Sequence, residues 1–147
     1  MAMKDEVTIF YTDDDQDDLE FFREIVDIID SKFVVVTQNS ASELLLALEN
    51  PPPTPFVVFL DINMPGINGL EILKKVRELE KHRELPIVIF STSSDELTIE
   101  KSRSLGANYY LPKSGVFDKL RKSIQHTLSI NWKEFAPATE NFVYHYS

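Results

Sequence analysis

The sequence contains no cysteine, and this absence removes several classes of chemistry. A chain without thiols cannot be a disulfide scaffold, use a cysteine nucleophile or hold zinc through cysteine ligands. Positive charge is also scarce, with 15 Lys and Arg against 24 Asp and Glu, which gives a net charge of −9. Nucleic acids and anionic lipid surfaces favour basic proteins, and we therefore expect neither nucleic acid nor membrane as a partner.

Long apolar runs are missing as well. The longest strongly apolar runs, such as residues 56–60, are far shorter than the ~20 residues of a transmembrane helix. Residues 1–6 carry mixed charges with no apolar stretch behind them, which is unlike a secretion signal. We therefore expect a cytoplasmic protein. Its 147 residues, 43% of them hydrophobic, fit one ordinary globular domain.

Five short apolar runs and five helical patterns alternate along the chain. The runs, rich in β-branched and aromatic residues, are 7–11, 33–36, 56–60, 87–90 and 109–111. The helical patterns are 19–29 (with Leu19, Phe22, Val26 and Ile29 on one face), 40–48, 70–79, 95–105 (ending at Gly106) and 116–130. Continuous apolarity indicates strands buried on both faces, as in a parallel sheet between helices. The pattern predicts an α/β fold with five parallel strands and five helices.

Polar residues that can bind ligands or take part in chemistry follow four of these predicted strands. Asp13 and Asp14 come after the first, Asp61 after the third, Ser91 after the fourth and Lys113 after the fifth. Ligands bind outside the carboxyl ends of strands in open α/β sheets, so we expect these side chains to share one edge. Two carboxylates beside a buried strand repel each other, and a divalent cation relieves that cost.

The acidic run after the first strand also has simpler interpretations. Asp15 as a helix N-cap, with Asp17 and Asp18 in the first turn, favours the positive end of the helix dipole. A calcium-binding loop is a weaker alternative, because Asp13, Asp15, Asp17 and Glu24 have EF-hand spacing. Asp18 then stands where that loop requires glycine, and a strand rather than a helix precedes it.

Four segments together resemble the receiver domain of two-component response regulators. They are 9–15, 60–69, 86–91 and 106–113, in the family's order, and the resemblance covers residues 5–130. The spacing of Asp61, Met64, Pro65 and Gly69 is the most specific part. The resemblance implies a flavodoxin-like, doubly wound five-stranded parallel sheet of order 2-1-3-4-5. It predicts a receiver domain over residues 1–130 and a C-terminal aromatic tail over 131–147 without an output domain.

The resemblance implies that Asp61 is the phosphoacceptor. The phosphoryl group would come from a phosphohistidine of a sensor histidine kinase or a histidine phosphotransfer protein. Carboxylate nucleophiles form acyl phosphates in such transfers. Mg²⁺ is the implied cofactor, held by Asp13, Asp14, Asp61 and the backbone carbonyl of Asn63.

Three further residues receive roles from the same resemblance. Ser91 is expected to donate a hydrogen bond to a phosphoryl oxygen, and Lys113 to form an ion pair with another. Tyr110 occupies the position of the switch aromatic, whose ring turns inward when the hydroxyl residue moves toward the phosphate. Ser114 follows Lys113 where the family usually has proline, so the resemblance does not fix the shape of that loop.

The predicted function is a stand-alone, single-domain response regulator that signals through contact with a downstream protein. It is predicted to be a phosphoacceptor signalling domain that catalyses its own phosphotransfer and slow dephosphorylation rather than an enzyme. A non-phosphorylated pseudo-receiver that serves only as a binding module is the alternative. An aspartyl-phosphate phosphatase of the dehalogenase type is disfavoured, because it needs a second acid where this chain has Asn63.

The tail is unusually aromatic for a free chain end. Trp132 and Phe135 are expected to complete the last helix and pack on the body of the domain. Phe142, Tyr144 and Tyr146 are hypothesised to contact a partner or a second copy of the chain, which would make a homodimer possible. On that hypothesis, deletion of residues 137–147 leaves the thermal midpoint nearly unchanged.

Overall fold

The computed structural model describes residues 6–52, 56–64, 68–132, 134–135 and 141–146. The strands are β1 (Val7–Thr12), β2 (Phe33–Gln38), β3 (Phe56–Leu60), β4 (Ile87–Ser91) and β5 (Tyr109–Pro112). The helices are α1 (Gln16–Ile29), α2 (Ala41–Ala47), α3 (Gly69–Glu78), the 3₁₀ turn η1 (Glu80–His82), α4 (Glu96–Ser104) and α5 (Phe117–Leu128). The strands begin where the apolar runs predict, and α5 ends two residues before the predicted position 130.

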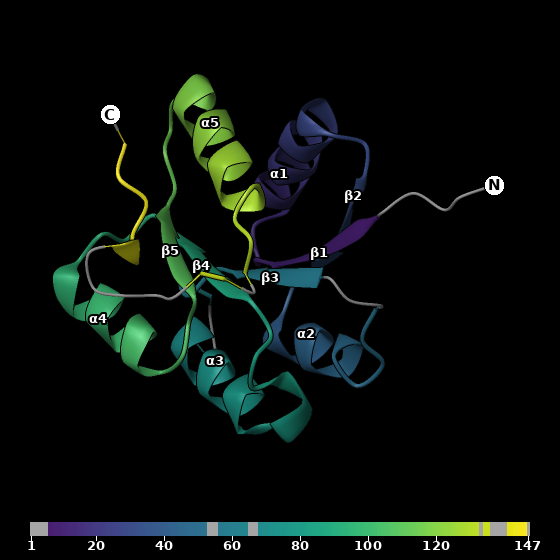
Figure 1. Cartoon of the computed structure of the whole chain (residues 1–147), viewed down its shortest axis with the longest axis vertical. Coiled ribbons are helices and arrows are strands. Elements are labelled where there is room, and N and C mark those ends of the chain that lie inside the picture. Colours follow the sequence, from purple (N-terminus) through teal and green to yellow (C-terminus); the bar gives the residue numbers. More distant parts are fainter. Residues whose placement is uncertain (1–5, 53–55, 65–67, 133, 136–140, 147) are drawn as a thin grey trace.

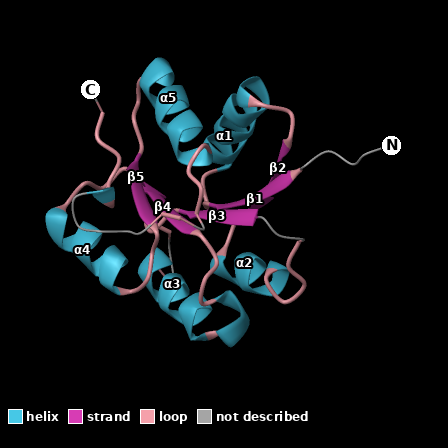
Figure 2. Ribbon diagram, in the orientation of Figure 1, coloured by secondary structure: helices cyan, strands magenta, loops and turns pink. Residues whose placement is uncertain are grey.

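The strands form one parallel sheet in the order β2-β1-β3-β4-β5, which confirms the predicted topology. Helices α1 and α5 cover one face of this sheet, and α2, α3 and α4 cover the other (Figures 1 and 2). Every strand pair is parallel, with Tyr11 opposite Phe59 and Ile89 opposite Tyr110. The carboxyl ends of the five strands therefore lie along the same edge.

Each face of the sheet has its own core. Aromatic rings dominate the α1–α5 side, where Phe22 packs against Tyr11, Phe59 and Phe90 with ring centroids 4.6–5.8 Å apart. Aliphatic side chains dominate the other side, where Ile72 and other residues of α2 and α3 meet the sheet. These two layers fix the ends of β1, β3, β4 and β5 relative to one another.

Strand β2 departs from the expectation that all strands are buried on both faces. Val34 and Val36 are exposed, while Phe33 and Val35 face the α1–α5 core. The prediction is wrong for this strand because β2 is at the edge of the sheet. Helix α2, with seven residues, does not cover it fully.

Short-range signals place the helix ends. Asp15 is the N-cap of α1, as predicted, and accepts hydrogen bonds from the backbone N–H groups of Asp17 and Asp18. Gly106 has a φ of 105°, the left-handed conformation that a residue after a helix commonly adopts. Among the described residues, the helices are too short or too polar to cross a membrane.

The tail returns to the sheet and pairs with the outer edge of β5. The N–H of Tyr110 donates to the carbonyl of Phe142 at 2.9 Å, and the N–H of Tyr144 donates to the carbonyl of Tyr110 at 3.0 Å. Val143 thus forms a parallel bridge opposite Tyr110. The tyrosine hydroxyl of Tyr146 donates to the carbonyl of Pro112. The exposed edge of the sheet is covered by the chain's own tail.

These contacts change the interpretation of the tail. Trp132 and Phe135 pack on Tyr109, with ring centroids at 6.2 and 5.8 Å, so their predicted contact with the body is confirmed. They lie beyond α5, however, and do not complete that helix. The hypothesis that Phe142 faces a partner is wrong, because its side chain is 1% exposed and belongs to the core.

Candidate functional site

The first part of the site follows β1. Asp13 is fully buried, and one of its carboxylate oxygens accepts a hydrogen bond from the hydroxyl of Tyr11. The other oxygen accepts from the backbone N–H of Asp15 at 3.0 Å. Asp14 is exposed beside it. One acid is therefore held rigidly in the protein, and its neighbour is open to solvent.

Asp61 follows β3 and is almost fully buried. The backbone N–H of Asn63 donates to its Oδ1 at 3.0 Å. Helix α3 begins close to this turn, and a Cβ on Gly69 would approach the carbonyl oxygen of Asp61 to 2.7 Å and the Cα of Ile62 to 2.5 Å. Only glycine allows this approach, which explains its position in the motif. Residues 65–67, the rest of that motif, lie outside the described residues.

The three carboxylates of Asp13, Asp14 and Asp61 can hold a metal ion. Each offers one oxygen, and these oxygens lie within 4.8 Å of one another. A set of hard oxygen donors with an open side fits Mg²⁺, which binds a few carboxylates and keeps several waters. The residues therefore fit the implied ion.

A chain of hydrogen bonds connects the ends of β3, β4 and β5. The side-chain amide of Asn63 donates to the Oγ of Ser91 at 3.0 Å, and the backbone N–H of Ser93 donates to the same oxygen at 3.2 Å. The hydroxyl of Tyr110 donates to the carbonyl of Ser93 at 2.8 Å. Ser91 and Tyr110 are fully buried. The ring of Tyr110 is thus turned inward.

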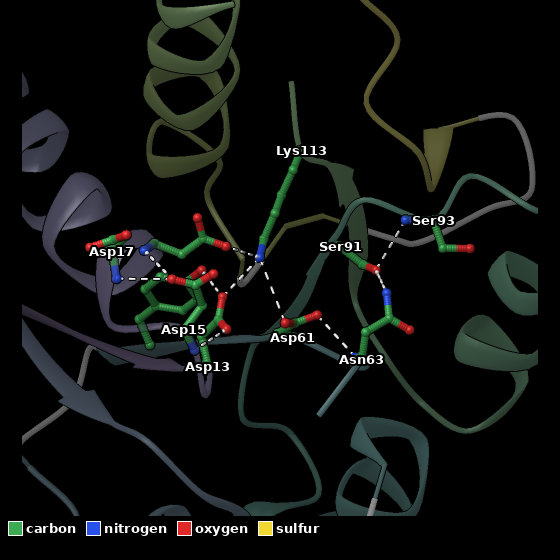
Figure 3. Close-up of polar contacts among 10 residues, drawn as sticks. Asp13, Asp15, Asp17, Asp61, Asn63, Ser91, Ser93 and Lys113 are labelled. Atoms are coloured by element: carbon green, nitrogen blue, oxygen red, sulfur yellow. Dashed lines mark hydrogen bonds and ion pairs between the residues drawn. The ribbon is translucent and has the colours of Figure 1, made fainter. Parts of the chain in front are cut away.

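Lys113 reaches from the end of β5 into the carboxylates (Figure 3). Its Nζ lies 2.8 Å from Asp13 Oδ2, 3.0 Å from Asp18 Oδ2 and 3.6 Å from Asp61 Oδ2. The ring of Phe90 lies beside the ammonium, with its centroid 5.3 Å from Nζ. The predicted site residues therefore lie at one edge of the sheet, and Lys113 offsets part of their negative charge.

The electrostatics of the two buried acids differ. Burial raises the pKa of Asp61 to about 6, with the negative charge of Asp13 adding to the rise and the Asn63 N–H and Lys113 opposing it. Burial also acts on Asp13, but hydrogen bonds from Lys113 and Tyr11 outweigh it and lower its pKa. Of these two buried acids, Asp61 is therefore the one whose ionised form is less stabilised by the surrounding groups.

This difference predicts a pH-dependent gain in stability from Asp61→Asn. A raised folded-state pKa means that the contribution of Asp61 to stability is present below its unfolded pKa of 3.8 and lost as the pH rises through about 6. In EDTA at pH 7.5 the variant is expected to be more stable by about 3 kcal/mol. Urea unfolding at pH 7.5 and pH 4 measures this. A gain of equal size at both pH values contradicts the raised pKa.

The sequence did not indicate the contact between Asp18 and Lys113. Asp18 lies in the first turn of α1, where its charge is explained by the helix dipole alone. Its partner is 95 residues away in sequence, and only the packing of α1 beside the end of β5 brings the two together. No local pattern reports such a pair.

Comparison with known proteins gives a consistent result. A family model described as the response regulator receiver domain matches residues 9–125. Response regulator Rcp1 of Synechocystis sp. is 26% identical over 122 residues, which are 80% of this chain and 83% of Rcp1. The crystal structure of an Mn²⁺-bound form of Rcp1 is similar with a TM-score of 0.72 and 25% identity, covering 88% of this chain and 96% of that chain.

Two further relatives extend the comparison. The phosphorylated cyanobacterial phytochrome response regulator RcpA has a TM-score of 0.75 and 26% identity, covering 89% of this chain and 96% of that chain. A protein-glutamate methylesterase/protein-glutamine glutaminase of Trichodesmium erythraeum is 30% identical over 114 residues. That match covers 75% of this chain but only 32% of the methylesterase, so the chain spans about a third of that relative.

Proposed function

The chain belongs to the response regulator receiver domain family, and from this premise we propose that it accepts a phosphoryl group on Asp61. The donor is a phosphohistidine of a sensor histidine kinase or a histidine phosphotransfer protein. The observation that carries the proposal is the grouping at one sheet edge: a buried Asp61, two further carboxylates within 4.8 Å, and the Lys113 ammonium 3.6 Å away. RcpA, which has the same fold, is described in a phosphorylated form.

Asp61 is the nucleophile of the proposed reaction. One of its carboxylate oxygens forms a bond to phosphorus while the bond from phosphorus to the imidazole nitrogen breaks, and the imidazole leaves with the electron pair and takes up a proton. Transfer of this kind depends mainly on positioning and on neutralising charge. The backbone N–H of Asn63 holds Oδ1 of Asp61, which orients the carboxylate.

The surrounding groups neutralise the charge of the phosphoryl group. Mg²⁺, when bound by Asp13, Asp14, Asp61 and the backbone carbonyl of Asn63, supplies positive charge that the crowded carboxylates need. Lys113 pairs with one phosphoryl oxygen. Ser91 accepts hydrogen bonds from two N–H groups, which leaves its own hydroxyl proton to be donated to another phosphoryl oxygen.

Tyr110 links the site to the segment after β4 in this proposal, and its ring is turned inward already in the unphosphorylated chain. The hydroxyl of Tyr110 donates a hydrogen bond to the backbone carbonyl of Ser93, two residues after Ser91. A shift of Ser91 toward a phosphoryl group would therefore also move the carbonyl to which Tyr110 is hydrogen-bonded. Output through a downstream protein is the consequence. The boundary between residues 1–130 and the tail, a cytoplasmic location, homodimer formation and the absence of any enzymatic output stay predictions.

Phosphorylation by acetyl phosphate tests the proposal. With excess Mg²⁺, the intact mass is expected to increase by one phosphoryl group, and with EDTA it is expected to stay unchanged, because the carboxylates then lack the ion. The same incubation without acetyl phosphate is the control. A chain that binds Mg²⁺ but gains no mass is instead a pseudo-receiver, a binding module without phosphotransfer.

A further inference from the structure

The ammonium of Lys113 is shared among three acids from three different elements. Among the described residues, the carboxylates within 4.0 Å of Nζ are those of Asp13, Asp18 and Asp61. Two of its three N–H donors are in hydrogen bonds, to Asp13 Oδ2 at 2.8 Å and to Asp18 Oδ2 at 3.0 Å, whereas Asp61 lies beyond hydrogen-bond distance. Asp61 is the most distant, at 3.6 Å, although it is the residue that the proposed reaction modifies.

Asp18 differs from the other two partners in exposure. Its side chain is 44% exposed, against 1% for Asp13 and 8% for Asp61. Water can therefore solvate the carboxylate of Asp18 once Lys113 leaves it, whereas a buried acid left without a partner is costly. Of the three acids, Asp18 is therefore the one whose loss of contact with Lys113 costs the least free energy.

The contact between Lys113 and Asp18 lies beside a cavity. Lys113 and Asp18 line a cavity of about 260 Å³ between α1 and the segment that joins β5 to α5. Tyr11, Phe22, Phe90 and Leu120 form much of its apolar wall. Water in this cavity can reach the carboxylate of Asp18 once Lys113 leaves it.

Asp61 is the most distant of the three acids, so a phosphoryl group on it draws the ammonium of Lys113 away from Asp13 and Asp18. From the distances and exposures above, we infer that Asp18 is a positioning residue that holds Lys113 in the unphosphorylated protein and competes with the phosphoryl group for it. Phosphorylation then exchanges the contact from Lys113 to Asp18 for one from Lys113 to a phosphoryl oxygen. Asp18 thereby lowers the stability of the phosphorylated state. This inference rests on the proposed phosphoacceptor role of Asp61.

Equilibrium binding of beryllium trifluoride, a tetrahedral mimic of a carboxyl-bound phosphoryl group, tests the competition. In excess Mg²⁺, Asp18→Asn is expected to bind the mimic about two- to fivefold more tightly than the wild type by isothermal titration, the range for a partly exposed ion pair. The matched control is Asp17→Asn. It removes the same charge from the same turn, but its side chain is exposed and makes no ion pair with Lys113.

A double-mutant cycle separates this role from a structural one. In a Lys113→Met background, Asp18→Asn is expected to leave the affinity for the mimic unchanged, because Asp18 acts only through the lysine. The inference is overturned if Asp17→Asn and Asp18→Asn gain equal affinity for the mimic, or if the gain persists in the Lys113→Met background. Either result leaves the phosphoacceptor proposal standing. A wild-type protein that does not bind the mimic at all overturns the phosphoacceptor proposal, and this inference with it.

Discussion

Asp61→Asn is expected to abolish phosphorylation of the chain by acetyl phosphate. The amide that replaces the carboxylate has no anionic oxygen, so it cannot form the acyl phosphate. Asp13 is not expected to take its place, because both of its carboxylate oxygens accept hydrogen bonds, from Tyr11, Asp15 and Lys113. Intact mass after incubation with acetyl phosphate and Mg²⁺ should match that of untreated protein. Urea unfolding of the same variant in EDTA at pH 7.5 shows whether it is folded.

Asp15→Asn is the matched control for this experiment. Asp15 is two residues from Asp13 and caps α1, a role that asparagine performs about equally well. This variant removes an acidic residue near the site without touching Lys113, and it should be phosphorylated as the wild type is. Continued phosphorylation of Asp61→Asn under the same conditions would sink the assignment of Asp61.

The second large effect concerns the tail. Phe142→Ala is expected to lower the free energy of unfolding by about 3–5 kcal/mol, because the ring is 1% exposed and packs beside Tyr110. For a domain of this size the thermal midpoint should fall by roughly 10 °C. Deletion of residues 137–147 should cost more, since it also removes the two hydrogen bonds to the backbone of Tyr110. Thermal and urea unfolding measure both variants.

His145→Ala is the control for the tail. His145 is exposed and lies between Tyr144 and Tyr146, so its removal should change the free energy of unfolding by no more than about 0.5 kcal/mol. If Phe142→Ala unfolds at the wild-type midpoint, the tail is not part of the core. That result would restore the hypothesis that the tail serves a partner.

Much of the fold could be predicted because its signals are local. Five apolar runs and five helical patterns specify the elements, and Gly106 marks the end of α4 through its positive φ. The strand order came from the resemblance to receiver domains. The exposure of Val34 and Val36 could not be read from the sequence, because an edge strand in this sheet has the same apolar composition as a central one.

The residues of the site also divide into those that the sequence could predict and those that it could not. Ser91 ends a strand and Asp13, Asp61 and Lys113 follow strands, so the topology of a parallel sheet is enough to bring them to one edge. Asp18 needs the packing of α1 against the end of β5. Phe142 needs the tail to return to the edge of β5. The positions of Asp18 and Phe142 both depend on contacts between segments that are distant in sequence. The aromatic composition of the tail suggested a protein interface, because aromatic residues are common both in cores and at interfaces.

The position of the phosphoryl group is the most direct test of the account. The chain is phosphorylated with acetyl phosphate and Mg²⁺, then reduced with borohydride, which converts an aspartyl phosphate to homoserine, and the peptides are mapped by mass spectrometry. Homoserine is expected at position 61 and at no other aspartate. Homoserine at Asp13 or Asp14, or a phosphate ester that survives reduction on Ser91, would contradict the assignment of Asp61 as the phosphoacceptor.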